Sequence, residues 1–234
     1  MSMESTTEET APPWRAARPR PAASLVLVRE GPGGPEVLLG RRGAGARFMP
    51  GRYVFPGGRV QRSDSLPWAG EAIAADVEAR LLAHARAALR ETFEETGLLL
   101  ARPVANGMAA NAAPAAGASE VERALALRRL VPALDALRPI GRAITPARSP
   151  IRFHARFFLA DGALAAGSPA AGEELEDVRW CAVGERIPAP MSDVTRFMLR
   201  HALAVWRGEA SAGLPLYRYV RGIRRVQWSG AAAP

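Results

Sequence analysis

The chain has 234 residues, of which 48% are hydrophobic, and its formal net charge is +8. This length and composition suit one sizeable domain with its own core, and no apolar run is long enough to cross a membrane. The single cysteine, Cys181, excludes an intramolecular disulfide and a cysteine metal cluster, so a cytoplasmic location is the default expectation.

The first 21 residues combine glutamates and prolines without an apolar stretch, which predicts a flexible arm rather than a signal peptide. The functional domain is expected to follow, over residues 22–234. Hydrophobic periodicity and turn residues predict its elements. Strands are expected at residues 24–29, 36–41, 52–55, 152–159 and 177–183, helices at 76–96 and 192–207, a helical pattern at 121–137, and a loop at 104–119.

The predicted helix at residues 76–96 carries three carboxylates on one face. Glu91, Glu94 and Glu95 lie within about 100° of one another around a helix axis, whereas Phe93 lies on roughly the opposite side. The apolar side is suited to burial. The carboxylate oxygens are suited to Mg²⁺ or Mn²⁺, and a solvated acidic surface is the alternative interpretation.

Two motifs resemble the two halves of the Nudix box. Residues 90–98 read Arg-Glu-Thr-Phe-Glu-Glu-Thr-Gly-Leu, which resembles the right half, Arg-Glu-apolar-x-Glu-Glu-x-Gly-apolar. In the left half, Gly58 is followed after five residues by Asp64, where the family usually has glutamate. The usual box has seven residues between this acid and the arginine, and the separation is much longer here. An insert within residues 65–82 explains the difference.

Residues 38–58 resemble the signature of the coenzyme A diphosphatase branch of the Nudix hydrolases. That signature reads Leu-Leu-Thr-x-Arg-Ser/Ala, three residues, Arg, three residues, Gly, three residues, Phe-Pro-Gly-Gly. Arg42, Arg47 and Gly51 fall in register, as does the Phe-Pro-Gly-Gly run at residues 55–58, while glycines occupy the Thr and Ser/Ala positions. The long insert is similar to that of peroxisomal-type members with an interrupted box.

The resemblance implies an α/β fold, the Nudix α/β/α sandwich with a mixed sheet and an insert before the Nudix helix. It implies that water attacks a phosphorus in the pyrophosphate of a nucleoside diphosphate derivative. The branch points to coenzyme A or acyl-CoA as substrate, giving 3′,5′-ADP and 4′-phosphopantetheine or its acyl derivative. A diphosphatase for NADH, ADP-ribose or another nucleotide is one alternative, and a nucleotide-binding domain without hydrolysis is another.

The resemblance also implies a metal site. Glu91, Glu94 and Glu95 would hold Mg²⁺ or Mn²⁺, with the carbonyl of Gly57 as a further oxygen. Glu91 would act either as a ligand or as the general base. In the family, a glutamate from a late loop often completes the site, and this sequence offers three candidates: Glu173, Glu174 and Glu176.

Three arginines have implied roles in positioning or substrate binding. Arg90 would pair with the acid at the position of Asp64 and orient the helix, without touching substrate. The register of Arg42 and Arg47 with the branch signature implies contact with phosphate, including the 3′-phosphate of coenzyme A.

The charge distribution indicates a polyanionic partner. Residues 64–100 hold seven acidic residues against three arginines, whereas the flanking segments 23–63 and 207–234 are rich in arginine. This pattern suits a small, CoA-like nucleotide substrate with several phosphates. Nucleic-acid binding is the less favoured interpretation of the arginines that alternate with apolar residues at 217–228. No membrane partner is expected, and the oligomeric state stays open, with a homodimer as one alternative.

Overall fold

The computed structural model describes five stretches of the chain: residues 16–71, 79–104, 117–183, 190–209 and 213–229. Four predicted features fall partly outside these residues: most of the N-terminal arm, part of the insert expected within residues 65–82, the helix start near residue 76, and most of the loop at 104–119. None of the described helices is both long and apolar enough to cross a membrane.

Twelve strands and three α-helices make up the described fold. The strands are β1 (Arg20–Gly31), β2 (Gly34–Arg42), β3 (Tyr53–Val54), β4 (Gly57–Arg59), β5 (Leu99–Pro103), β6 (Leu130–Pro132), β7 (Arg138–Ile144), β8 (Phe153–Asp161), β9 (Ala165–Ala166), β10 (Leu175–Ala182), β11 (Leu214–Val220) and β12 (Ile223–Ser229). The helices are α1 (Ala79–Thr96), α2 (Glu120–Leu127) and α3 (Asp193–Trp206), and short 3₁₀ turns lie at Ser63–Ser65, Leu134–Ala136 and Gly162–Leu164.

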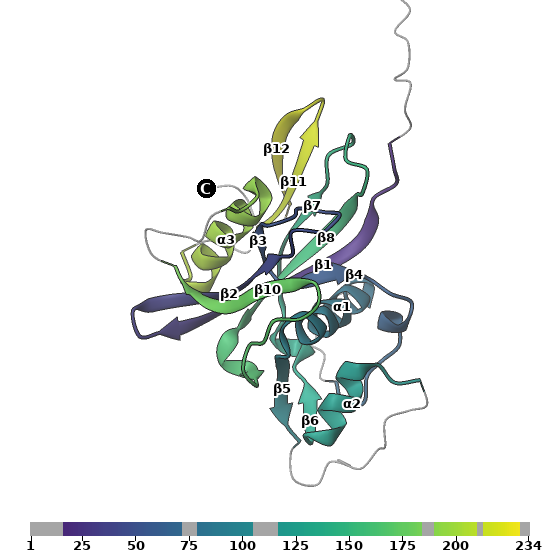
Figure 1. Cartoon of the computed structure of the whole chain (residues 1–234), viewed down its shortest axis with the longest axis vertical. Coiled ribbons are helices and arrows are strands. Elements are labelled where there is room, and N and C mark those ends of the chain that lie inside the picture. The colour runs from purple at the N-terminus through teal and green to yellow at the C-terminus, as the bar shows by residue number, and fades with distance from the viewer. Residues whose placement is uncertain (1–15, 72–78, 105–116, 184–189, 210–212, 230–234) are drawn as a thin grey trace, which may run out of the picture.

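Nine strands form one mixed sheet in the order β10-β2-β1-β8-β7-β11-β12, with β3 beside β2 and β4 beside β1. The pairs β1–β8 and β7–β11 are parallel, and the other pairs are antiparallel. A smaller sheet has the order β6-β5-β9. Figure 1 shows α1 and α3 on opposite sides of the large sheet. The expected α/β/α sandwich with a mixed sheet is therefore confirmed.

The central strand β1 shows why the sheet needs a helix on each face. Successive side chains of a strand point to opposite faces. Leu25 and Leu27 belong to the core cluster that includes α1, whereas Val26 and Val28 belong to the cluster that includes α3. All four side chains are fully buried. Continuous apolar sequence in β1 thus reflects burial on both sides.

The ends of the two long helices follow their local sequence. At the start of α3, the Ser192 side chain accepts a hydrogen bond from the N–H of Thr195, which satisfies a free donor of the first turn. At the end of α1, Gly97 has φ 71° and its N–H donates to Phe93 O. This left-handed conformation suits glycine because it has no Cβ.

The helical pattern at residues 121–137 is the main error among the predicted elements. The helix α2 ends at Leu127, and the chain continues as β6 and a 3₁₀ turn. Arg129 adopts φ 54°, which lies outside the right-handed helical region. Pro132 lies two residues after Leu130, and it disfavours helical geometry at the residue before it. The apolar residues therefore come from three short elements rather than one helix.

A buried ion pair fastens the segment before α1 to the helix. Arg86 Nε donates to Glu71 Oε2 over 2.8 Å, and Arg86 Nη1 donates to the carbonyl oxygen of Asp64 over 3.1 Å. The side chains of Arg86 and Glu71 are only 4% and 7% exposed. Trp68, between the two anchored positions, packs in the core on the α1 side of the sheet. Residues 64–71 are thus held against α1.

Replacing Glu71 by Ala should destabilise the protein by about 3 to 5 kcal/mol, because the buried guanidinium of Arg86 loses its charged partner. Urea-induced unfolding followed by circular dichroism measures this change. The matched control is Glu176→Ala, which breaks an exposed pair with Arg41 and should cost at most about 1 kcal/mol. Equal losses in the two variants would contradict the anchoring role.

Candidate active site

The glycine turn at the start of β4 lies against the acidic face of α1. The N–H of Gly57 donates to Glu95 Oε2 over 2.8 Å. A Cβ atom at position 58 would lie 2.5 Å from the carboxylate of Glu91. Gly58 is therefore required for this close approach, since any side chain would displace Glu91. The two motifs found in the sequence meet at one place in the structure.

Arg90 connects the carboxylates of α1 to the segment that precedes the helix. Its Nε and Nη2 donate to the two oxygens of Asp64 over 2.9 Å and 3.1 Å. Its Nη1 donates to Glu91 Oε1 over 2.9 Å and to Glu94 Oε2 over 2.8 Å. Nη2 also donates to the carbonyl oxygen of Arg59. The fork of one guanidinium therefore sets the positions of three carboxylates and one backbone carbonyl.

The charge of Arg90 is maintained by this environment. Burial alone would lower the pKa of Arg90, but its hydrogen bond to Asp64 and the charges of Glu91 and Glu94 raise it above the usual value. Arg90 and Asp64 are 2% and 1% exposed. Loss of either partner would leave a buried charge without compensation. The pair expected between them is present, although aspartate is one methylene shorter than the usual glutamate.

Two carboxyl groups of α1 have raised pKa values. Burial raises the pKa of Glu95 to about 8, with the charges of Glu91 and Glu174 adding to the effect while the Gly57 hydrogen bond and Arg42 oppose it. Burial also raises the pKa of Glu91, against the opposing effect of the Arg90 charge. These carboxylates repel one another in a partly dehydrated place. A bound cation would relieve that repulsion.

The structure separates the three late glutamates by location. Glu174 lines the same cavity as Glu91, and its charge acts on both Glu91 and Glu95. Glu176 instead pairs with Arg41 at 3.0 Å, with half of its side chain exposed. Glu173 is exposed and does not line the cavity. Only Glu174 is therefore placed to join the carboxylates of α1.

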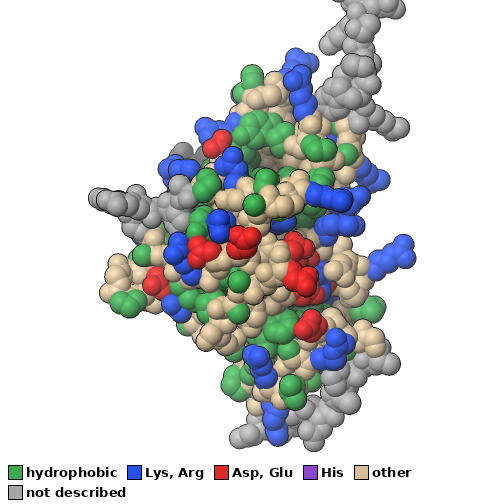
Figure 2. All heavy atoms as spheres, viewed as in Figure 1, with side chains coloured by type: hydrophobic (Ala, Val, Ile, Leu, Met, Phe, Trp, Pro, Cys, Tyr) green, Lys and Arg blue, Asp and Glu red, His purple; other side chains and the backbone are tan. Residues whose placement is uncertain are grey.

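A cavity of about 810 Å³ extends from these carboxylates along one end of the sheet. Glu91, Gly57, Gly58 and Glu174 lie at the acidic end. Five arginines also line it: Arg20, Arg42, Arg47, Arg59 and Arg62. In Figure 2, acidic side chains gather over α1 and β10, with arginines around them. This juxtaposition suits a ligand with several phosphate groups and a cation.

Arg42 is the most enclosed of these arginines. It follows the buried part of β2, and its Nη2 lies 3.4 Å from Glu174 Oε2. Its Nε is buried without a hydrogen-bond partner among the described residues. Arg20, Arg59 and Arg62 form no ion pair with any other described residue. Several cationic groups at the cavity are thus available to anionic ligand oxygens.

The donor atoms and charges of these residues suit a divalent cation, but the side chains do not yet form a complete coordination shell. Carboxylate oxygens are the ligands that Mg²⁺ and Mn²⁺ prefer, and burial raises the pKa values of Glu91 and Glu95 despite the opposing charges of Arg90 and Arg42. Among the described residues, no three His, Cys, Asp or Glu side chains are already close enough to hold a metal ion. Arg90 occupies the space between two of them. Metal binding therefore requires carboxylate side chains to rotate toward one another.

Comparison with known structures decides the family, although no family model matches the chain. The structure is similar to that of a Nudix hydrolase from Alicyclobacillus acidocaldarius, with 35% sequence identity over 70% of this chain and 78% of that chain, and a TM-score of 0.51. The chain belongs to the Nudix hydrolase family. A MutT Nudix hydrolase from Burkholderia pseudomallei is also similar, with 21% identity over 79% of this chain and 98% of that chain, and a TM-score of 0.47. The expectation of a Nudix pyrophosphohydrolase is confirmed.

Sequence reasoning missed several residues of this Nudix hydrolase that line the cavity. Arg59 and Arg62 lie between the two residues that mark the left half of the box, so their position was a usable signal. Tyr217 and Tyr219 come from β11 near the other end of the chain, and no motif connects them to the box. Their place in the cavity follows only from the pairing of β11 with β7.

The raised pKa of Glu95 predicts a pH-dependent stability of the metal-free enzyme. The folded state retains a proton that the unfolded chain, with a glutamate pKa of 4.5, releases. Stability should therefore fall as the pH rises from about 4.5 to about 8. Glu95→Gln should flatten this profile, measured by urea unfolding in EDTA, while Glu120→Gln on α2 should leave it unchanged. Parallel profiles for all three proteins would contradict the assignment.

Proposed function

We propose that this Nudix hydrolase cleaves the pyrophosphate bond of coenzyme A or acyl-CoA. The observation that carries the proposal is the position of Arg42. It falls in register with the coenzyme A signature, lines the cavity beside Glu91, and keeps a buried Nε without a partner among the described residues. A phosphate oxygen would satisfy this donor with a charge-assisted hydrogen bond.

We further propose that the Nudix box is interrupted by an insert within residues 65–82. Support comes from the contacts that both halves make despite their separation in sequence. Gly57 bonds to Glu95, and Asp64 bonds to Arg90. The part of the insert up to Glu71 is anchored by Arg86. Lengthening a loop adds only about 1 kcal/mol or less of closure entropy, so the box tolerates the insertion.

The proposed reaction breaks one P–O bond of the pyrophosphate bridge. Oxygen of a water molecule forms a bond to one phosphorus, and the bridging oxygen leaves with the other phosphate, giving 3′,5′-ADP and 4′-phosphopantetheine or its acyl derivative. When bound, Mg²⁺ or Mn²⁺ would neutralise charge on the phosphoryl oxygens and lower the pKa of the attacking water. The cation would be held by Glu91, Glu94 and Glu95, with the Gly57 carbonyl as a further ligand.

Side chains of the protein would carry out proton transfer, positioning and phosphate binding. Glu91 would act either as a ligand of the cation or as the general base that accepts the proton of the water. Arg90 would act as a positioning residue, since its donors are already used by protein carboxylates and a carbonyl. Glu174 would complete the acidic end of the site. The cavity arginines would bind and orient the phosphates.

Glu94→Gln and Glu95→Gln should each lower kcat by at least about two orders of magnitude, or roughly 3 kcal/mol of transition-state stabilisation, with little loss of fold. Each change keeps the side-chain shape and removes one negative charge from the cation site. Turnover is measured across titrations of Mg²⁺ and Mn²⁺. The control Glu120→Gln should behave as the unmodified enzyme. Near-normal turnover in both site variants would refute the assignment.

Substrate choice provides a separate test. If Arg42 or Arg47 binds the 3′-phosphate, the enzyme should prefer coenzyme A to 3′-dephospho-CoA by roughly ten- to a hundredfold in kcat/KM. Changing the responsible arginine to Ala should remove this preference and leave dephospho-CoA hydrolysis nearly unchanged. Arg218→Ala, on β11 outside the cavity, is the matched control. Equal rates on both substrates would exclude the contact, and faster hydrolysis of NADH or ADP-ribose would assign the enzyme to those nucleotides.

A further inference from the structure

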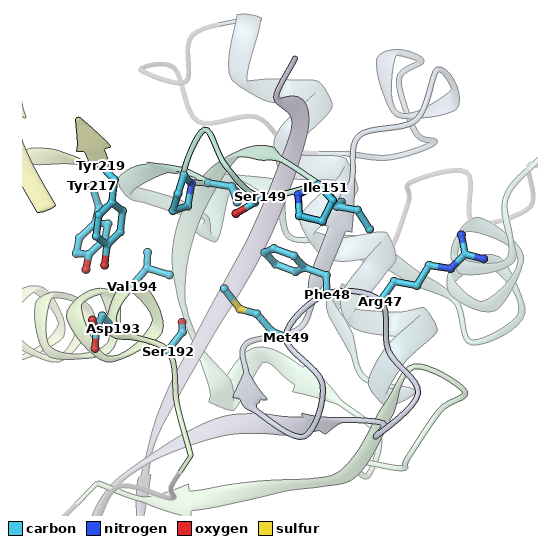
Figure 3. A pocket seen from close by; sticks show the side chains of 13 residues that line it. Arg47, Phe48, Met49, Ser149, Ile151, Ser192, Asp193, Val194, Tyr217 and Tyr219 are labelled. Carbon is cyan, nitrogen blue, oxygen red and sulfur yellow. The ribbon is translucent and has the colours of Figure 1, made fainter. Parts of the chain in front are cut away.

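A side pocket of about 350 Å³ adjoins the large cavity, and neither Glu91 nor Glu174 lines it. Both spaces are lined by Phe48, Met49, Tyr217 and Tyr219, so they are continuous. Figure 3 shows the two tyrosine rings side by side, with Phe48 and Ile151 across the pocket from them. The pocket therefore has mainly apolar and aromatic walls and adjoins the large cavity.

One edge of the pocket is polar. Tyr217 is 2% exposed, and its hydroxyl is buried without a hydrogen-bond partner among the described residues. The hydroxyls of Tyr217 and Tyr219 point toward the first turn of α3, where Asp193 lies (Figure 3). Burial and the neighbouring Tyr219 raise the pKa of Tyr217 to about 12, against the opposing effect of Arg224, so its hydroxyl stays protonated. The hydroxyl can therefore donate to an acceptor on a ligand.

These features indicate which chemical group of a nucleotide substrate the pocket can bind. An acyl chain would fit the apolar walls but leave the Tyr217 hydroxyl unsatisfied, which is unfavourable in a buried place. A phosphate group could approach Arg47, which also lines the pocket, but next to the tyrosines it would meet the carboxylate of Asp193 and be repelled. A flat heteroaromatic ring satisfies both requirements, because its faces are apolar and its edge carries donors and acceptors.

We propose that this pocket binds the adenine base of the substrate, with the Tyr217 hydroxyl donating to a ring nitrogen and Asp193 accepting from the exocyclic amine. The aromatic side chains Phe48 and Tyr217 would contact the ring faces. The inference rests on the proposed function in assuming an adenine nucleotide as substrate. It adds that residues of β11 and α3, which lie outside the Nudix box, determine the specificity for the base.

The test uses direct binding, so that it is independent of the hydrolysis assays. Isothermal titration calorimetry compares AMP with ribose 5-phosphate, IMP and 4′-phosphopantetheine. AMP should bind at least about tenfold more tightly than ribose 5-phosphate, which lacks the base, and more tightly than IMP, which presents an oxygen where AMP presents the amine. Failure of coenzyme A hydrolysis with these preferences intact would refute the substrate alone and leave the base pocket standing.

Two variants make the assignment specific. Tyr217→Phe should weaken AMP binding about three- to tenfold and leave ribose 5-phosphate binding unchanged, because it removes only the hydroxyl that is proposed to donate to the base. Asp193→Asn should reduce the preference for AMP over IMP, since an amide side chain also donates. Equal affinity for AMP and ribose 5-phosphate, or unchanged AMP binding in Tyr217→Phe, would overturn the proposal. Selective weakening of 4′-phosphopantetheine binding would also overturn the proposal, because it would show that the pocket binds the opposite end of the substrate.

Discussion

The buried guanidinium of Arg90 is the constraint on which the arrangement of the site depends. It holds Asp64 on one side and Glu91 and Glu94 on the other. Without it, Asp64, Glu91 and Glu94 would share a partly dehydrated region and would lose the cation that each of them contacts. The same contact fixes the orientation of α1 relative to the chain that carries Gly57 and Gly58. The contacts of Arg90 therefore both balance the charges of these carboxylates and set the position of α1.

The sandwich architecture brings distant segments to one end of β1. The core on one face of the sheet holds α1 with its carboxylates, and the core on the other face holds α3 with its capped N-terminus. The cavity is lined by residues from both helices and by Arg20 and Ala22 at the start of β1. The acidic and aromatic regions of the site thus lie against different cores, and the strands between the two cores, including β1, connect them.

The sequence predicted those parts of the candidate site whose residues lie close together in the chain. Residues 57–58 and 91–95 each mark a local conformation, a turn that only glycine permits and a helix face, so their chemistry could be inferred. The sequence could not show which of Glu173, Glu174 and Glu176 lies near the carboxylates of α1. Their positions depend on the pairing of β10 with β2 and on the register shift within β10. Residues 217–228 suggested nucleic-acid binding as an alternative, and their local pattern did not indicate that β11 and β12 pair as a hairpin or that Tyr217 lines the cavity.

The anchoring of the segment before α1 has a consequence for how this chain accepts changes in length. Gly57 and Asp64 both bond to side chains of the same helix, so the number of residues between them must match a fixed distance along α1. A residue added there would pull one of the two contacts apart. Related sequences should therefore remain constant in length between Gly57 and Asp64.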